Sequence, residues 1–207
     1  MAAAGYESRW PMRSGTRVTM RSMQATQRIT ADEYLALDLE EQHTELVDGA
    51  IVVNEARLPH ALLSMRLIRA LDDWIRASDG RGLLTIPIDV GVDKHNVYAP
   101  DLLWYRAARA PAVDAVWPYP LPDLAIEIRS PSTWRYDIGA KKNAYEREGL
   151  PELWLVDGDA SVLLVFRRSA PNAPSFDVAL EFDRAATLNS PLLPGFALDV
   201  GALFDLS

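Results

Sequence analysis

The chain of 207 residues contains no cysteine and only three histidines, His43, His60 and His95. The absence of cysteine excludes disulfides, thiolate metal sites, iron–sulfur clusters and cysteine nucleophiles. Because the three histidines are scattered along the chain, a histidine-rich zinc site is not expected. A bound metal would therefore be held mainly by carboxylate oxygens, which are ligands that suit Mg²⁺, Mn²⁺ or Ca²⁺.

The sequence also has no long apolar run and little positive charge. No apolar stretch approaches the roughly 20 residues that a membrane helix needs, and the first residues lack the apolar core of a secretory signal. We therefore expect a cytoplasmic protein that does not bind membranes. The formal net charge of −8 gives no overall attraction to nucleic acid, although a local basic groove is compatible with it.

Several familiar catalytic loops are missing as well. There is no Gly-x-Gly-x-x-Gly and no Walker-type loop, so nucleotide-phosphate cradles have no support. The absence of a Gly-x-Ser-x-Gly elbow argues against an α/β-hydrolase serine. The remaining chemical signal comes from carboxylates on apolar strands.

The length predicts one domain preceded by a tail. Residues 1–28 carry five arginines against the single acid Glu7, and they show no helical or strand periodicity. We predict that this segment is disordered or dispensable, although an arginine-rich start is also found in transit peptides and Met20 or Met23 could be the true start. The single folded domain is predicted to span residues 29–207.

From residue 29 the chain alternates between helical and strand patterns. Thr30 and Glu33 form a capping box that opens a short helix, and Asp48-Gly49 predicts a tight hairpin turn. Helices are predicted over 30–37, 60–78, 136–149 and 201–206, and strands over 43–47, 50–56, 83–92, 97–105, 121–129, 152–157, 161–168, 175–182 and near 196. This order predicts an α/β (α+β) fold, in which a mixed central sheet is flanked by helices and carries additional β-hairpins.

Two carboxylates lie inside these apolar strands. Asp101 follows Pro100 in the strand 97–105, and Glu127 lies within the strand 121–129. An isolated buried carboxylate costs several kcal/mol unless it is paired or bound to a cation. Two of them on neighbouring strands would therefore invite a divalent metal ion.

The helix that follows contributes a lysine to the same region. Asp137, Lys141 and Tyr145 are spaced at i, i+4 and i+8, so they share one stripe of this helix. Because the helix directly follows the strand of Glu127, it can fold back so that Lys141 points at the carboxylate pair. We therefore predict a site built from strand Asp, strand Glu and helix Lys.

Each of these residues also has a purely structural interpretation. Asp101 could accept a hydrogen bond from a backbone amide at the start of its strand, and Glu127 could pair with a nearby arginine such as Arg129. Asp137 and Lys141 could form an ordinary surface ion pair, which contributes only a few tenths of a kcal/mol. The combination of the three features favours a functional site more than any one of them does.

The chain resembles a known family at these residues. The resemblance is carried by Pro100-Asp101, Glu127-Ile128-Arg129-Ser130-Pro131-Ser132-Thr133, Arg135-Tyr136-Asp137, Lys141, Tyr145, Gly149, Pro151-Glu152 and Trp154-Leu155-Val156-Asp157, and upstream by Glu45-Leu46-Val47-Asp48-Gly49 and His60. The pattern is similar to the PD-(D/E)XK nuclease superfamily, and more closely to its Uma-type branch of restriction endonucleases. The resemblance extends over about residues 29–200.

The resemblance implies a nuclease-like mixed sheet. It also implies that the protein is a metal-dependent endonuclease that hydrolyses phosphodiester bonds of nucleic acid, with DNA expected as the substrate in preference to RNA. It implies that Asp101 and Glu127 bind Mg²⁺ or Mn²⁺, with the Ile128 carbonyl as a third ligand and Glu45 as an outer carboxylate. It also implies that Lys141 supplies the catalytic ammonium, from the helical position typical of this branch. Lys141 would orient the attacking water or stabilise the charge that develops on the phosphate.

Asp137, Tyr145, Arg129 and His60 are expected to support this site. Arg129 occupies the position where the superfamily usually has lysine and the Uma-type branch an apolar residue. Because a guanidinium stays charged, Arg129 cannot be a general base, but it could stabilise developing charge or pair with Glu127 and weaken metal binding. Arg129 and the acidic composition are therefore also compatible with a catalytically silent module that binds nucleic acid or a partner protein. A hydrolase that acts on another phosphoester is a further alternative. The protein could also form a homodimer.

Overall fold

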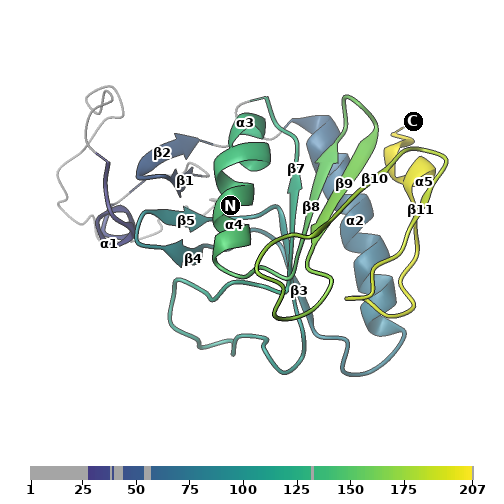
Figure 1. The fold of residues 1–207 in the computed structure, drawn as a ribbon, viewed down its shortest axis with the longest axis horizontal. Helices are drawn as coiled ribbons and strands as arrows, with labels where there is room; N and C mark the ends of the chain where they lie inside the picture. The colour runs from purple at the N-terminus through teal and green to yellow at the C-terminus, as the bar shows by residue number, and fades with distance from the viewer. Residues whose placement is uncertain (1–27, 38, 40–43, 54–56, 132, 207) are drawn as a thin grey trace, which may run out of the picture.

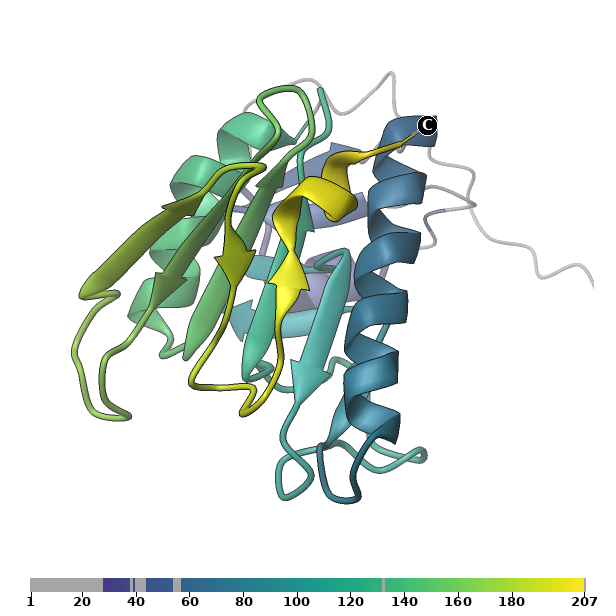
Figure 2. The same cartoon turned by 90° about the vertical axis from the view of Figure 1, so that its right-hand side faces the viewer.

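The computed structural model describes residues 28–37, 39, 44–53, 57–131 and 133–206. Apart from Arg28, the predicted N-terminal tail lies outside the described residues. A six-stranded mixed sheet forms the centre, with the long helix α2 (Leu58–Arg76) on one face and the helical segment 134–147 on the other (Figures 1 and 2). The predicted arrangement of a mixed sheet flanked by helices is confirmed.

The central sheet has the strand order β10-β9-β8-β7-β6-β3. Its strands are β3 (Leu83–Thr85), β6 (Leu102–Tyr105), β7 (Leu124–Ile128), β8 (Glu152–Asp157), β9 (Val162–Arg167) and β10 (Val178–Phe182). Strands β7 and β8 are parallel and all other neighbours in this sheet are antiparallel. The helical segment 134–147 is therefore the crossover connection that a parallel pair requires.

Two smaller sheets accompany the central one. A four-stranded sheet has the order β2-β1-β5-β4, and a two-stranded sheet pairs β11 with β12 near the C-terminus. The remaining elements are α1 (Ala31–Leu35), β1 (Thr44–Val47), β2 (Ala50–Val53), β4 (Val90–Asp93), β5 (Asn96–Tyr98), β11 (Thr187–Leu188), β12 (Leu198–Asp199) and α5 (Val200–Phe204).

The core is divided between the two faces of the central sheet. On one face, α2 buries Leu63, Leu67 and Leu71 against Ile126 of β7. Each fully buried leucine contributes about 1.5–3 kcal/mol relative to an exposed one. On the other face, Leu153 and Leu155 of β8 pack with Ala144 and Tyr145 of the helical segment. Neighbouring residues of β7 belong to opposite faces, as the alternation of side chains along a strand requires.

Local signals in the sequence correspond to local structure. The capping box is present, since the Glu33 amide donates to Thr30 Oγ1 at 3.3 Å and the Thr30 amide donates to Glu33 Oε2 at 2.8 Å. Asp48 and Gly49 have φ values of 48° and 76°, which are the positive values that a type I′ hairpin turn requires. Both predictions are confirmed.

Two strands predicted as continuous are instead broken, and this is the main correction to the predicted fold. The segment 83–92 forms β3 and β4, and the segment 97–105 forms β5 and β6. In each case the two halves belong to different sheets. Pro87 and Pro100 stand at the breaks, because proline cannot donate a hydrogen bond to a strand ladder. The chain at Pro100 therefore passes from the four-stranded sheet into the central sheet.

The helix predicted over 136–149 also departs from a regular α-helix. It is divided into α3 (Trp134–Tyr136), the π-helical turn η2 (Asp137–Lys141) and α4 (Lys142–Arg147). Single π-helical turns are rare and are found frequently at functional sites. Asp137 and Lys141 occupy the two ends of this turn, and both are buried.

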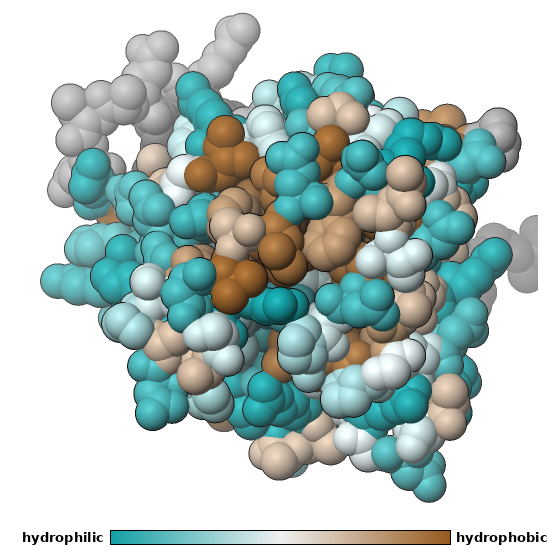
Figure 3. Space-filling model, turned by 45° about the vertical axis from the view of Figure 1, so that its right-hand side comes forward, coloured by the Kyte–Doolittle hydropathy of each residue, from teal (hydrophilic) through white to brown (hydrophobic). Residues whose placement is uncertain are grey.

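The surface carries both hydrophilic and apolar side chains (Figure 3). On the face shown in Figure 3, apolar side chains gather in the upper centre and hydrophilic ones surround them. Among the described residues, no helix is both long enough and apolar enough to span a bilayer.

Candidate active site

The candidate site lies where the four-stranded sheet meets the central sheet. Glu45 comes from β1, Asp101 directly precedes β6, and Glu127 lies on β7. Asp137 and Lys141 come from η2, on the helical segment that covers the central sheet. All five side chains are buried, so the fold gathers the charged residues that the sequence singled out.

The Lys141 ammonium lies among three carboxylates. Its Nζ is 2.7 Å from Glu127 Oε1, 2.9 Å from Glu45 Oε1 and 3.2 Å from Asp137 Oδ1. Lys141 is 1% exposed. Lys141 therefore contacts Glu127 as predicted, but Asp101 is not among the ion-pair partners of Lys141. Glu45 and Asp137 are additional partners of the same ammonium.

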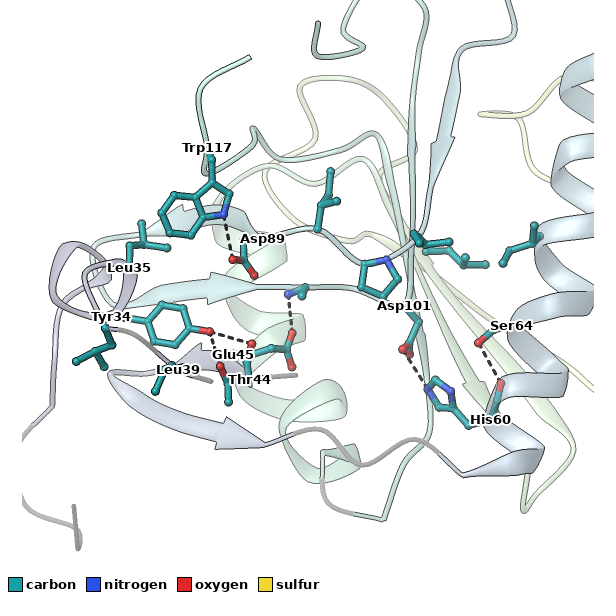
Figure 4. A pocket seen from close by; sticks show the side chains of 17 residues that line it. Tyr34, Leu35, Leu39, Thr44, Glu45, His60, Ser64, Asp89, Asp101 and Trp117 are labelled. Carbon is teal, nitrogen blue, oxygen red and sulfur yellow. Dashed lines mark hydrogen bonds and ion pairs between the residues drawn. The ribbon is translucent and has the colours of Figure 1, made fainter. Parts of the chain in front are cut away.

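Asp101 has a different set of partners. Its Oδ2 accepts a hydrogen bond from the Ile128 amide at 2.7 Å. This oxygen therefore has a backbone amide as its partner, as the purely structural interpretation of Asp101 predicts. Its Oδ1 lies 3.0 Å from His60 Nε2 on α2 (Figure 4). The antiparallel register pairs Leu102 with Ile126, which brings Asp101 next to the end of β7 that carries Glu127.

Further hydrogen bonds orient the carboxylates. The Tyr145 hydroxyl donates to Glu127 Oε1 at 2.9 Å, and the Ala99 amide donates to Glu45 Oε1 at 2.8 Å. The Thr133 hydroxyl donates to Asp137 Oδ2 at 3.0 Å. Tyr145 was predicted as a supporting residue, whereas the contact of Thr133 was not. Its only signal in the sequence is its i, i+4 spacing to Asp137.

Arg129 does not pair with Glu127. Its Nη1 donates to both carboxylate oxygens of Asp157, at 2.9 and 2.8 Å, and its Nη2 lies 3.4 Å from Asp159 Oδ2. The strand β7 ends at Ile128, so strand alternation no longer governs the direction of the Arg129 side chain. The alternative in which Arg129 pairs with Glu127 is therefore absent from this structure.

Burial and the contacts with Lys141 set the electrostatics of the cluster. Burial raises the pKa of Glu127 well above its usual value, and it raises the pKa of Glu45 and of Asp137 as well, although Lys141 opposes each shift. Burial alone would lower the pKa of Lys141, but the surrounding carboxylates outweigh it and raise this pKa well above its usual value. The cluster therefore favours a protonated Lys141 and makes its carboxyl groups harder to ionise than free ones.

These shifts predict that the metal-free protein loses stability as the pH rises. In EDTA, the free energy of unfolding should fall from about pH 5 to about pH 8, because folded Glu127 retains a proton that its unfolded form loses above its usual pKa of 4.5. His60 acts in the same direction above pH 6.5, since Asp101 raises its pKa although burial opposes this. Urea denaturation at several pH values measures the trend.

The Glu127→Gln variant is the control for this pH dependence. It should show a flatter decline, because it keeps an oxygen that can accept from Tyr145 but no longer titrates. The lowered pKa values of Asp93, Glu33 and Asp177 act only below about pH 4.5, outside this window. A stability that rises between pH 5 and pH 8 would contradict the assigned shifts.

The residues present fit a hard divalent cation by their chemistry. In the described part of the chain, no three or more His, Cys, Asp or Glu side chains are arranged as a ready metal cage, and Lys141 lies among three of the carboxylates. The donors are nevertheless carboxylate oxygens, which Mg²⁺ and Mn²⁺ prefer. Two buried polar atoms of the described side chains, His60 Nε2 and Asp137 Oδ1, make ion-pair contacts with Asp101 and Lys141 but no hydrogen bond of regular geometry, and both belong to this site.

One side of the site borders a cavity of about 590 Å³, whose described lining does not include Glu127, Asp137 or Lys141. Glu45, His60 and Asp101 line one part of it, and Asp89 and Trp117 line another (Figure 4). No sequence pattern predicted this second part. Trp117 lies in a proline-rich loop between two strands, and nothing local in the sequence indicates that the loop reaches the site.

A mixed sheet that carries buried carboxylates beside a helical lysine defines the restriction-endonuclease-like class of folds. A family model named Uma2 and described as "Putative restriction endonuclease" matches residues 31–201, so the chain belongs to this family.

A solved structure from Anabaena variabilis shows the same fold. It is titled as the crystal structure of a putative nuclease belonging to DUF820, and it matches with a TM-score of 0.70 and 19% sequence identity. The match covers 85% of this chain and 97% of the Anabaena chain. The search of the curated proteins finds no match.

Proposed function

We propose that the protein is a divalent-metal-dependent endonuclease that hydrolyses phosphodiester bonds of nucleic acid, with DNA as the substrate. The observation that carries the proposal is the convergence of buried Asp101, Glu127 and Lys141 at one site, with Asp101 lining an adjacent cavity. Membership of the restriction endonuclease family supports the same reaction.

The metal would be held by oxygen donors of this chain. Asp101 and Glu127 would bind Mg²⁺ or Mn²⁺, the Ile128 carbonyl would be a further ligand, and Glu45 would be an outer carboxylate. When bound, such an ion polarises a phosphate oxygen and lowers the pKa of water, which makes an effective nucleophile at neutral pH.

Lys141 would act as a positive charge and not as a base. Its raised pKa keeps the ammonium protonated at neutral pH, so it can stabilise the negative charge that develops on the phosphate. Glu45, Glu127 and Asp137 hold the ammonium in place. Tyr145 is a positioning residue, because its hydroxyl fixes the Glu127 carboxylate.

Cleavage assays with plasmid DNA, single-stranded DNA and RNA test the proposed function. The protein should cleave DNA with Mg²⁺ or Mn²⁺ and not in EDTA, and Asp101→Asn should lower the rate at least about a hundredfold. Mn²⁺ should also raise the melting temperature of the parent more than that of Asp101→Asn. Asp159→Asn is a matched control, because this carboxylate is 81% exposed and should leave the rate unchanged.

Two results would contradict this proposal. The first is cleavage by Asp101→Asn at the rate of the parent, and the second is cleavage by the parent in EDTA. Melting curves of both variants show whether a lost activity reflects a lost fold.

A catalytically silent module that binds nucleic acid or a partner protein is the second candidate. The observation that favours it is the position of Lys141, whose ammonium already pairs with three carboxylates that could otherwise attract an ion. A silent module would show neither cleavage nor a change in melting temperature with Mn²⁺, whereas the nuclease would show both.

A further inference from the structure

The cavity beside the candidate site extends well beyond the carboxylates. At one end lie Asp101 and His60, and Glu45 lies between them and the far end (Figure 4). The far end is formed by Trp117 and Leu35, with Tyr34, Leu39 and Asp89 beside them. A substrate whose reacting phosphate lies near Asp101 would therefore place an adjacent part of the same strand in this far end.

The charge of the lining decides which part of a nucleotide can enter. The described residues that line the cavity include three acids, Glu45, Asp89 and Asp101. These lining residues include no lysine and no arginine. A phosphate carries negative charge, so away from the metal donors it would meet repulsion without a compensating cation. A nucleobase is neutral and planar, and it meets no such repulsion.

The far end has the side chains that bind a planar ring. Trp117 is 45% exposed although it is large and apolar, and it lines the cavity. The Trp117 indole N–H donates to Asp89 Oδ2 at 3.0 Å, which orients the indole ring. An exposed, oriented indole is the kind of platform on which bases of single strands stack.

We propose that this far end, at Trp117, holds an unpaired nucleobase of the strand that is cleaved. The inference rests on the proposed nuclease function and names its substrate class: single-stranded nucleic acid, or a duplex in which one base is extruded. A base stacked inside a regular duplex cannot reach such a pocket unless it leaves the stack, which requires unpairing and unstacking.

Binding measurements with matched oligonucleotides test the base pocket. Fluorescence anisotropy with Ca²⁺ would measure the Kd of labelled oligodeoxythymidine of about 12 nucleotides, of an abasic strand of the same length and of a duplex. The parent should bind oligodeoxythymidine about tenfold or more tightly than the abasic strand. Trp117→Ala should remove most of this difference and leave the Kd of the abasic strand unchanged.

Two further variants separate stacking from other effects. Trp117→Phe should retain most of the base preference, because it keeps an aromatic ring but loses the N–H that donates to Asp89. Val116→Ala is the matched control, since Val116 is 89% exposed on the same loop and does not line the cavity. It should bind every oligonucleotide as the parent does.

The outcomes distinguish this inference from the proposed function. If the parent binds base-bearing and abasic strands equally, or if Trp117→Ala weakens both alike, the base pocket is overturned even when cleavage is observed. If no oligonucleotide binds, the base pocket is also overturned. If the base preference is present and depends on Trp117 but no strand is cleaved with Mg²⁺ or Mn²⁺, the pocket stands and the catalytic proposal fails.

Discussion

Replacement of Lys141 by methionine is expected to lower the free energy of unfolding by about 3–5 kcal/mol at neutral pH, because it removes one partner from a buried ion-pair cluster. Methionine has a similar length, so the loss would report the charge more than the volume. Without the ammonium, Glu45, Glu127 and Asp137 would share a buried site with no cation between them. Urea denaturation of the parent and of Lys141→Met in EDTA measures the difference.

The neighbouring lysine provides a matched control for this substitution. Lys142 is 21% exposed and lies 3.9 Å from Glu146, so Lys142→Met should change the stability by less than about 1 kcal/mol. The loss in Lys141→Met should become smaller near pH 5, because the three carboxylates can then take up protons. A loss below about 1 kcal/mol in Lys141→Met at neutral pH would show that the cluster does not depend on this lysine.

The same lysine is expected to dominate the cleavage rate. At a temperature where the variant is folded, Lys141→Met should cleave DNA about 10²–10³-fold more slowly than the parent, since it lacks one positioned group that stabilises charge. Arg129→Leu should retain the rate of the parent, because Arg129 pairs with Asp157 and not with Glu127. Initial rates on one DNA substrate with Mn²⁺ compare the three proteins directly.

A second measurement separates a catalytic effect from a loss of metal binding. The rise in melting temperature with Mn²⁺ should persist in Lys141→Met, because the proposed ligands are oxygen atoms of other residues. If Lys141→Met is active and Arg129→Leu is inactive, the catalytic cation is Arg129 and the assignment of Lys141 is wrong.

The structural consequence of Pro100 illustrates why some features could not be predicted. The residues on both sides of Pro100-Asp101 are apolar over 97–105, a pattern that predicts a single strand. The chain instead leaves one sheet at β5 and enters another at β6. A proline signals an interruption of the ladder, but it does not indicate that the two halves pair with different partners. That choice depends on strands distant in sequence.

The helix after β7 shows the same limit at the level of single residues. The spacing of Asp137, Lys141 and Tyr145 correctly places them on one side of a helical segment, and Tyr145 and Lys141 both contact Glu127. The π-helical turn could not be predicted, because its hydrogen-bonding pattern differs from the α-helix by one residue and no residue type requires it. The ion pair of Lys141 with Glu45 joins residues separated by 96 positions.

By itself, the sequence determined the features that depend on neighbouring residues: the capping box at Thr30, the turn at Asp48-Gly49, the amphipathic face of α2 and the candidate residues Asp101, Glu127 and Lys141. These follow from turn chemistry, from periodicity and from the resemblance to a family. Only the tertiary structure decided that Asp101 pairs with His60 and that Trp117 reaches the cavity of the site. Such contacts join segments far apart in the chain, because burial and sheet pairing minimise the free energy of the whole fold and leave no local trace in the sequence.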